Sequence, residues 1–215
     1  RTALPSAAII AITVWHVQLS RIGFRAVALP LTTACFLWSS GYAFRSRRAQ
    51  AWLMSGALYG ITFYTYVAAR FTPAALLAFA VYVVLAHKSE HLWPGALYFA
   101  VGATTALIPL GAYAIRHWDS AMGRPTQVSV FNPVVNQGDL WGTVGRHLIR
   151  TLGMFFVRGD SIPRHNIPGR PVFMPLIGAA TVLGAVRALR RARRRDASSA
   201  LVLIWVSTML VPTIA

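Results

Sequence analysis

GALYFAVGATTALIPLGAYAI, residues 95–115, is the stretch that decides the fold. It carries no charged side chain from Gly95 to Ile115. A helix needs about 20 predominantly apolar residues to cross the hydrocarbon core of a bilayer, and this run supplies them without interruption. Apolar runs of this kind are too long for a water-soluble core. The stretch therefore predicts a transmembrane helix.

Similar apolar runs on both sides of it predict an all-α fold, a polytopic bundle of transmembrane helices. We expect a single transmembrane domain over residues 1–215, with spans at about residues 3–15, 26–44, 51–69, 73–86, 95–115, 171–189 and 201–215. The run 73–86 is short for about 30 Å of hydrocarbon, which suggests a thinned or partial span. Because the chain begins without Met and ends inside an apolar run, we expect it to be an interior fragment of a larger protein.

The composition agrees with a membrane protein. Apolar residues make up 56% of the chain and charged residues only 12%, whereas about 25% of a soluble domain is charged. The net charge of +16 comes from basic residues that lie between apolar runs. Contact with anionic membrane lipids explains this placement better than a nucleic-acid partner does. The single Cys35 excludes a disulfide framework within the chain, and no cofactor motif is evident.

The basic clusters also predict an orientation. The clusters at 45–48 and 187–195 are separated by four expected spans, so both lie on the same side of the membrane. Dense positive runs favour the cytoplasmic side. Arg70 and the long polar connection 116–170 then lie on the extracytoplasmic side.

The long extracytoplasmic loop contains a predicted helix. Asp139 is placed to cap it, and apolar residues recur at helical spacing. These residues are Leu140, Val144, Leu148, Leu152 and Phe155. We expect this helix to lie in the membrane interface. A helix that merely covers the bundle is the alternative.

Most of the unusual chemistry lies in FFVRGDSIPRHNIPGRP, residues 155–171. Its Pro/Gly spacing excludes a helix and predicts a fixed loop of turns. Arg164, His165 and Asn166 supply three kinds of donor, which suit an anionic phosphate. A solvated surface that touches anionic headgroups is the plainer alternative. Asp160 either holds one of the arginines in place or caps a turn.

Two further groups could contact a lipid-linked substrate. Tyr59, Phe63, Tyr66 and Arg70 have the spacing of one helix face, either an aromatic belt at the interface or the wall of a cavity. Ser20 and Arg21 follow His16 at about one turn on the same side of the membrane, and we interpret them as cavity or phosphate contacts.

A metal site is not expected. HKSEH, residues 87–91, fits a zinc-protease pattern, but it occupies a short link rather than a stable helix with a further ligand. Carboxylates are scarce too. On the outer side only Asp119, Asp139 and Asp160 could act as a general base.

Three ordered motifs carry a family resemblance: WHVQLSRIGFR (15–25), GITFYTYVAARFTP (60–73) and GDSIPRHNIPGRP (159–171). Together they resemble bacterial polytopic glycosyltransferases of family 39, the group similar to protein O-mannosyltransferases and the aminoarabinose transferase of lipid A. The resemblance covers essentially the whole chain. It implies a GT-C fold in the bacterial cytoplasmic membrane, with a catalytic cavity on the extracytoplasmic side. Such enzymes move a sugar from a polyprenyl-phosphate donor to a hydroxyl or phosphate acceptor.

The resemblance also implies site residues. Arg70, Arg164 and His165 would face the donor phosphate, and the other substrate-binding candidates are Asn166, Tyr66, Tyr64, Arg21 and Ser20. The family's catalytic acid belongs to an early outer loop upstream of this chain, so no base is carried over, and Asp160 is the candidate within the motifs. A transporter for lipid-linked anions and a non-catalytic scaffold are the rival functions. The sequence indicates neither the sugar nor the acceptor.

Overall fold

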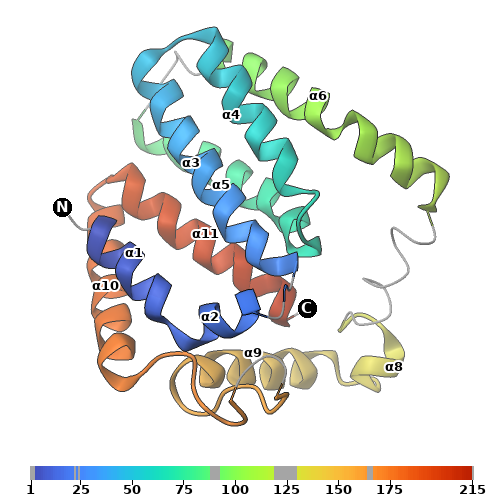
Figure 1. Ribbon diagram of the computed structural model, residues 1–215, viewed down its shortest axis with the longest axis vertical. Coiled ribbons are helices and arrows are strands. Elements are labelled where there is room, and N and C mark those ends of the chain that lie inside the picture. The colour runs from blue at the N-terminus through green and yellow to red at the C-terminus, as the bar shows by residue number, and fades with distance from the viewer. Residues whose placement is uncertain are drawn as a thin grey trace. The chain divides into compact units, whose positions relative to one another are not determined.

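The computed structural model describes residues 3–21, 23, 25–87, 93–118, 130–163 and 167–214. Within these ranges the chain is helical, with turns and short connections and no strand, which confirms the all-α prediction (Figure 1). The chain forms two compact units, residues 28–138 and residues 1–27 together with 139–215. Each unit is described by itself.

The unit 28–138 is built on three closely packed helices, α3 (Ala28–Ser46), α4 (Ala49–Thr62) and α6 (Trp93–Arg116). Helix α4 packs against both α3 and α6. It approaches α6 so closely that a Cβ on Gly56 would lie 2.0 Å from the Phe99 carbonyl oxygen, and one on Gly102 would lie 2.1 Å from that of Leu53. Only glycine fits at these crossing points.

Aromatic rings and hydroxyls fill the space between these helices. The Tyr59 ring centroid lies 5.1 Å from that of Phe36 and 5.5 Å from that of Phe99. The Thr72 hydroxyl donates to the Tyr59 hydroxyl at 3.0 Å, and the hydroxyls of Ser40 and Ser55 are 2.7 Å apart. The second contact joins α3 to α4, and both contacts satisfy hydroxyls inside this unit. The buried Ser46 hydroxyl at the end of α3 has no hydrogen-bond partner among the described residues.

The segment after α4 differs from the prediction. Helix α4 ends at Thr62 rather than near residue 69, because Phe63, Tyr64 and Thr65 form tight turns in which each N–H bonds three residues back. Tyr66 is extended, with φ −152° and ψ 150°. Tyr59, Phe63, Tyr66 and Arg70 therefore do not share one helix face.

Residues 70–73, at the expected junction of two spans, are helical. The 3₁₀ helix η2 (Val67–Phe71) leads directly into α5 (Thr72–His87), and Pro73 lies in the first turn of α5, where its missing N–H has no helical partner to lose. The run predicted as a short span from residue 73 is thus the later part of a helical segment of 20 residues, Val67–Ala86.

The other unit contains α1 (Ala3–Ile12), α2 (Val14–Arg21), η1 (Arg25–Val27), α9 (Leu140–Phe156), α10 (Pro175–Arg193) and α11 (Ala197–Ile214). Helix α11 packs against both α10 and α9. Helices α9 and α10 meet where a Cβ on Gly178 would lie 3.2 Å from the Phe156 ring. The short α8 (Pro133–Asn136) belongs to the unit 28–138.

Among the residues that the structure describes, two helical segments are long and apolar enough to cross a membrane. They are Val67–Ala86 and Pro94–Arg116, with mean hydropathies of 1.8 and 1.5. The apolar helix Ala197–Val211 is shorter. The other predicted spans are also helical where the structure describes them, but none of these helices is both as long and as apolar. The polytopic bundle therefore stays a prediction.

Candidate functional site

The connection between α9 and α10 is a closed loop, as the Pro/Gly spacing predicts. The Gly159 N–H donates to the Gly169 carbonyl at 3.3 Å, and the Gly169 N–H donates to the Asp160 carbonyl at 3.2 Å. Gly169 has φ +76°, a conformation that L side chains rarely adopt. These bonds bring the two ends of the loop together at its base.

The base of the loop is fixed to the last turn of α9. Backbone N–H groups of Val172 and Phe173 donate to the carbonyls of Met154 and Phe155 at 3.1 and 3.0 Å. The Phe173 ring stacks on Phe155 with centroids 5.5 Å apart and meets Phe156 edge-on at 5.8 Å. The backbone of residues 169–173 therefore has a defined place on α9.

Asp160 caps a turn inside this loop. Its Oδ1 accepts from the Ile162 N–H at 3.0 Å, and its backbone carbonyl takes part in closing the loop. Of the two roles expected for this carboxylate, the structure thus shows the turn-capping one. The bond uses only one of the two carboxylate oxygens, so it does not decide whether Asp160 could act as a general base.

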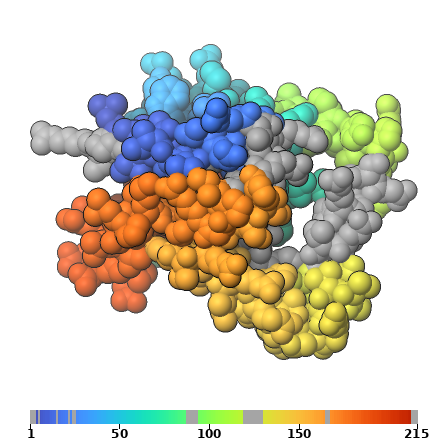
Figure 2. Space-filling model, turned by 60° about the horizontal axis from the view of Figure 1, so that its bottom comes forward, coloured from blue at the N-terminus to red at the C-terminus, as the bar shows by residue number. Residues whose placement is uncertain are grey.

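A cavity of about 110 Å³ lies beside the loop. Its walls come from the junction of α1 and α2 and from the segment that leads into α10: Ile12, Thr13, Val14, Arg170, Pro171, Val172, Met174 and Ile177. Figure 2 shows the N-terminal helices, in blue, directly beside this part of the chain, in orange. The cavity has room for roughly three or four groups the size of a water molecule.

The junction that forms one wall is a break in the helix. Thr13 is not helical, its Oγ1 donates to the Ile9 carbonyl at 2.6 Å, and its N–H bonds to Ile10 rather than to Ile9. Sequence reasoning placed one continuous run here and missed both the break and the cavity. The available signal was three successive β-branched residues, Ile12, Thr13 and Val14, which lower helix propensity together.

The chemistry of the cavity is that of an apolar chain with an anionic end. Seven of its eight lining residues are aliphatic residues, proline, methionine or threonine, and the eighth is Arg170, which is half-buried. A guanidinium fork matches phosphate oxygens, while the other walls favour hydrocarbon.

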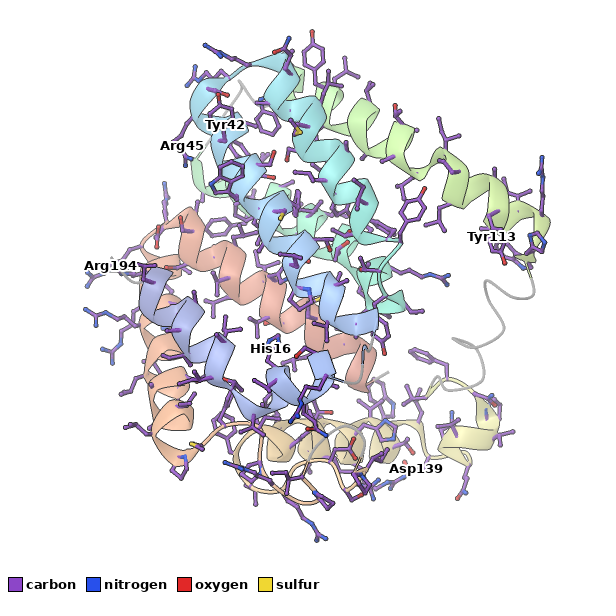
Figure 3. The ribbon with its side chains drawn as sticks, viewed as in Figure 1. His16, Tyr42, Arg45, Tyr113, Asp139 and Arg194 are labelled. Atoms are coloured by element: carbon purple, nitrogen blue, oxygen red, sulfur yellow. The ribbon has the colours of Figure 1, made fainter. Side chains whose placement is uncertain are left out.

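The predicted residues Ser20 and Arg21 lie at the end of α2, in the same unit as the loop. Both are exposed. The Ser20 hydroxyl donates to the Val17 carbonyl at 2.8 Å. His16 is half-buried one turn earlier in α2, where Figure 3 labels it.

The predicted residues Tyr64, Tyr66 and Arg70 belong to the other unit. The Tyr64 hydroxyl donates to the Ala106 carbonyl at 2.7 Å and so ties the turn after α4 to α6. Tyr66 and Arg70 are exposed around η2. Arg164, His165 and Asn166 lie outside the described residues, so the predicted grouping of Arg70 with Arg164 stays a prediction.

The helix predicted in the long loop is present as α9. The Asp139 Oδ1 accepts from the Gly142 N–H at 2.8 Å, which confirms the predicted cap, and its Oδ2 pairs with Arg146 at 3.3 Å. The face of α9 that is buried within the unit is not the apolar one. It carries Thr143 and Thr151, while Leu148 and Leu152 are exposed.

The described residues contain no group of three or more His, Cys, Asp or Glu side chains placed to hold a metal ion. Of the rejected zinc pattern, positions 88–91 lie outside the described residues. Comparisons of the chain with protein-family models, with curated proteins and with solved structures find no match.

Proposed function

We propose that the chain is the donor-binding part of a membrane glycosyltransferase, which moves a sugar from a polyprenyl-phosphate donor to an acceptor on the extracytoplasmic face of a bacterial cytoplasmic membrane. The observation that carries this proposal is the cavity whose lining combines Arg170 with apolar residues. A polyprenyl phosphate is an apolar chain that ends in an anion, so it matches both parts of that lining. The three sequence motifs agree with the same activity.

In this mechanism the protein stabilises the leaving group. An acceptor oxygen attacks the anomeric carbon while the bond from that carbon to the phosphate oxygen breaks, and the lipid phosphate leaves with the bonding electron pair. Guanidinium groups at the loop steady the charge that develops on the phosphate. The acceptor proton goes to a carboxylate. The family resemblance assigns that role to an acidic residue of an early outer loop, and Asp160 is the candidate within the three motifs.

The membrane setting follows from the same proposal. The segments Val67–Ala86 and Pro94–Arg116 cross the bilayer, and the remaining helices of the polytopic bundle complete the protein around them. The connection 116–170 faces outward, with α9 in the interface. The transporter alternative would use the same outer cavity without chemistry. The short run 73–86, the hint of a partial span that would favour it, belongs to the 20-residue helical segment Val67–Ala86.

The proposal is tested by sugar transfer in proteoliposomes that contain the parent protein and a labelled polyprenyl-phosphate sugar. Arg170→Ala should lower the transfer rate by about 100-fold. This is the size of effect expected when one hydrogen-bond donor to the developing negative charge is removed. Arg158→Ala is the matched control, because Arg158 is an exposed arginine of the same loop outside the cavity lining. It should change the rate less than about twofold, as expected for a solvated surface charge.

Equal rates for Arg170→Ala and the unsubstituted protein would contradict the proposed site. The same variants should also be compared for donor binding in the absence of acceptor. Binding and movement of the donor across the bilayer without any transfer of sugar would instead support a transporter.

A further inference from the structure

Helix α10 ends in an arginine stripe, defined here as Arg187, Arg190, Arg191 and Arg194. These residues are spaced i, i+3, i+4 and i+7, so they lie on one face of the helix. All four are exposed. Arg194 is the C-cap residue that directly follows α10, and Figure 3 labels it.

The positive charge of this stripe is not balanced by nearby acids. From residue 161 to residue 215 the sequence contains one carboxylate, Asp196, against six arginines between residues 187 and 195. The Asp196 side chain accepts a hydrogen bond from the Ser199 hydroxyl at the start of α11. Like charges at i and i+4, such as Arg187 with Arg191, destabilise a helix unless an anion lies between them.

The same face of α10 is apolar before the stripe begins. Leu176 and Leu183 are 83% and 70% exposed, and Leu183 lies one turn before Arg187. Along one face of the helix, exposed aliphatic side chains are therefore followed by exposed guanidinium groups. A bilayer presents the same order, hydrocarbon first and charged headgroups next.

We propose that the arginine stripe binds the headgroup phosphates of anionic phospholipids. The guanidinium forks hold the phosphate oxygens, while Leu176 and Leu183 contact the acyl chains of the same lipids. Nucleic acid is the less suitable partner because the adjoining face is aliphatic and offers no aromatic ring for base stacking. This site is separate from the proposed sugar transfer and does not depend on it.

The experiment measures lipid binding by native mass spectrometry of the full chain in neutral detergent, with phosphatidylglycerol and phosphatidylcholine added in equal amounts. We expect phosphatidylglycerol to be retained preferentially, since each arginine near an anionic surface contributes about fivefold. Replacing the stripe by Gln (R187Q, R190Q, R191Q and R194Q) should abolish the preference. Raising the salt concentration should weaken it in the unsubstituted chain.

The matched control removes the same charge elsewhere, by R45Q, R47Q, R48Q and R193Q. It should keep the preference, because the stripe is intact. Equal loss in both variants would mean that net charge alone attracts the lipid and would overturn the proposal. So would equal retention of the two lipids by the unsubstituted chain.

Two further measurements keep the test decisive. If the stripe variant loses its helical circular dichroism, the four positions are replaced by Lys instead, which retains charge without the fork and should lower the preference only in part. The second measurement is a competition experiment with a single-stranded oligonucleotide and, separately, with inorganic phosphate. If either competitor displaces bound phosphatidylglycerol while present at a lower concentration than the lipid, it is the better ligand, and the proposal is overturned.

Discussion

At the scale of single residues, two aspartates show what a local pattern reveals. Asp139 precedes an apolar periodic run, and the cap that this spacing predicts is present, because capping depends only on the next three residues. Asp160 lies among Pro, Gly and Arg, and the sequence left two roles open for it. The turn that it caps is local, because its Oδ1 accepts from Ile162. The closure of the loop from Asp160 to Gly169 is the part that no short-range pattern contains.

Asp196 gives a prediction at this scale. The hydrogen bond from Ser199 is the main cause that lowers the pKa of Asp196 below its ordinary 3.8, and the positive charge of Arg191 contributes in the same direction. A pKa that is lower in the folded than in the unfolded protein stabilises the fold at pH values above the ordinary pKa. That stabilisation is lost as the pH falls through the lowered pKa. Ser199→Ala should therefore raise the Asp196 pKa toward 3.8. Carbon-13 NMR titration of the carboxyl group measures it.

The control for Asp196 is Ser198→Ala, which removes a neighbouring hydroxyl while the Ser199 side chain stays in place. It should leave the titration of the Asp196 carboxyl nearly unchanged. A Ser199→Ala titration that overlays the unsubstituted one would show that this hydrogen bond is not the main cause of the low pKa.

At the scale of elements, the crossing of α4 and α6 depends on glycine. In Gly102→Ala the new methyl group would lie 2.1 Å from the Leu53 carbonyl oxygen, so the helices must separate. We expect a loss of about 1–3 kcal/mol in the free energy of unfolding. Gly111→Ala is the control in the same helix, because nothing lies within 4 Å of its Cβ position. It should be neutral or stabilising by up to about 1 kcal/mol.

Chemical denaturation in a mild detergent measures both variants. A Gly102→Ala protein as stable as Gly111→Ala would mean that the two helices do not cross at this distance.

Helix α9 gives a second prediction at this scale. Trp141 and Ile149 are 82% and 72% exposed, while Arg150 lies on a different exposed face. If α9 lies in the interface, a spin label at Ile149 should be more accessible to oxygen than to a water-soluble nickel complex, and a label at Arg150 should show the reverse. Both labels are introduced as cysteine in a Cys35→Ser background. The same accessibility pattern at both positions would place α9 away from the membrane surface.

Hydropathy located most of the helices and misplaced some of their ends. The sequence predicted a helix to residue 69, but α4 stops at Thr62, and the Tyr64 hydroxyl holds the following turn against Ala106 of α6. That contact joins residues 42 positions apart, and no window along the sequence contains both. The break at Thr13 was missed for a related reason, since an apolar run looks the same with or without an interruption.

At the scale of the whole molecule, the orientation gives a prediction. Positive clusters at 45–48 and 187–195 indicate one face, and the connection 116–170 with Arg70 indicates the other. A membrane-impermeant maleimide applied to intact cells should label cysteine at Arg70 or Arg158, which are both exposed. It should not label cysteine at Arg45 or Arg194. Labelling of Arg70→Cys and Arg194→Cys from the same side would refute the orientation.

The bonds from Val172 and Phe173 to the end of α9 have a mechanical consequence. They fix the loop that contains Arg170 to helix α9. If α9 lies in the membrane interface, the loop is held at the depth of the lipid headgroups. The depth at which the guanidinium sits is then set by bilayer thickness rather than by the loop alone. Sugar transfer should accordingly pass through an optimum as the acyl chains of the reconstituting lipid are lengthened.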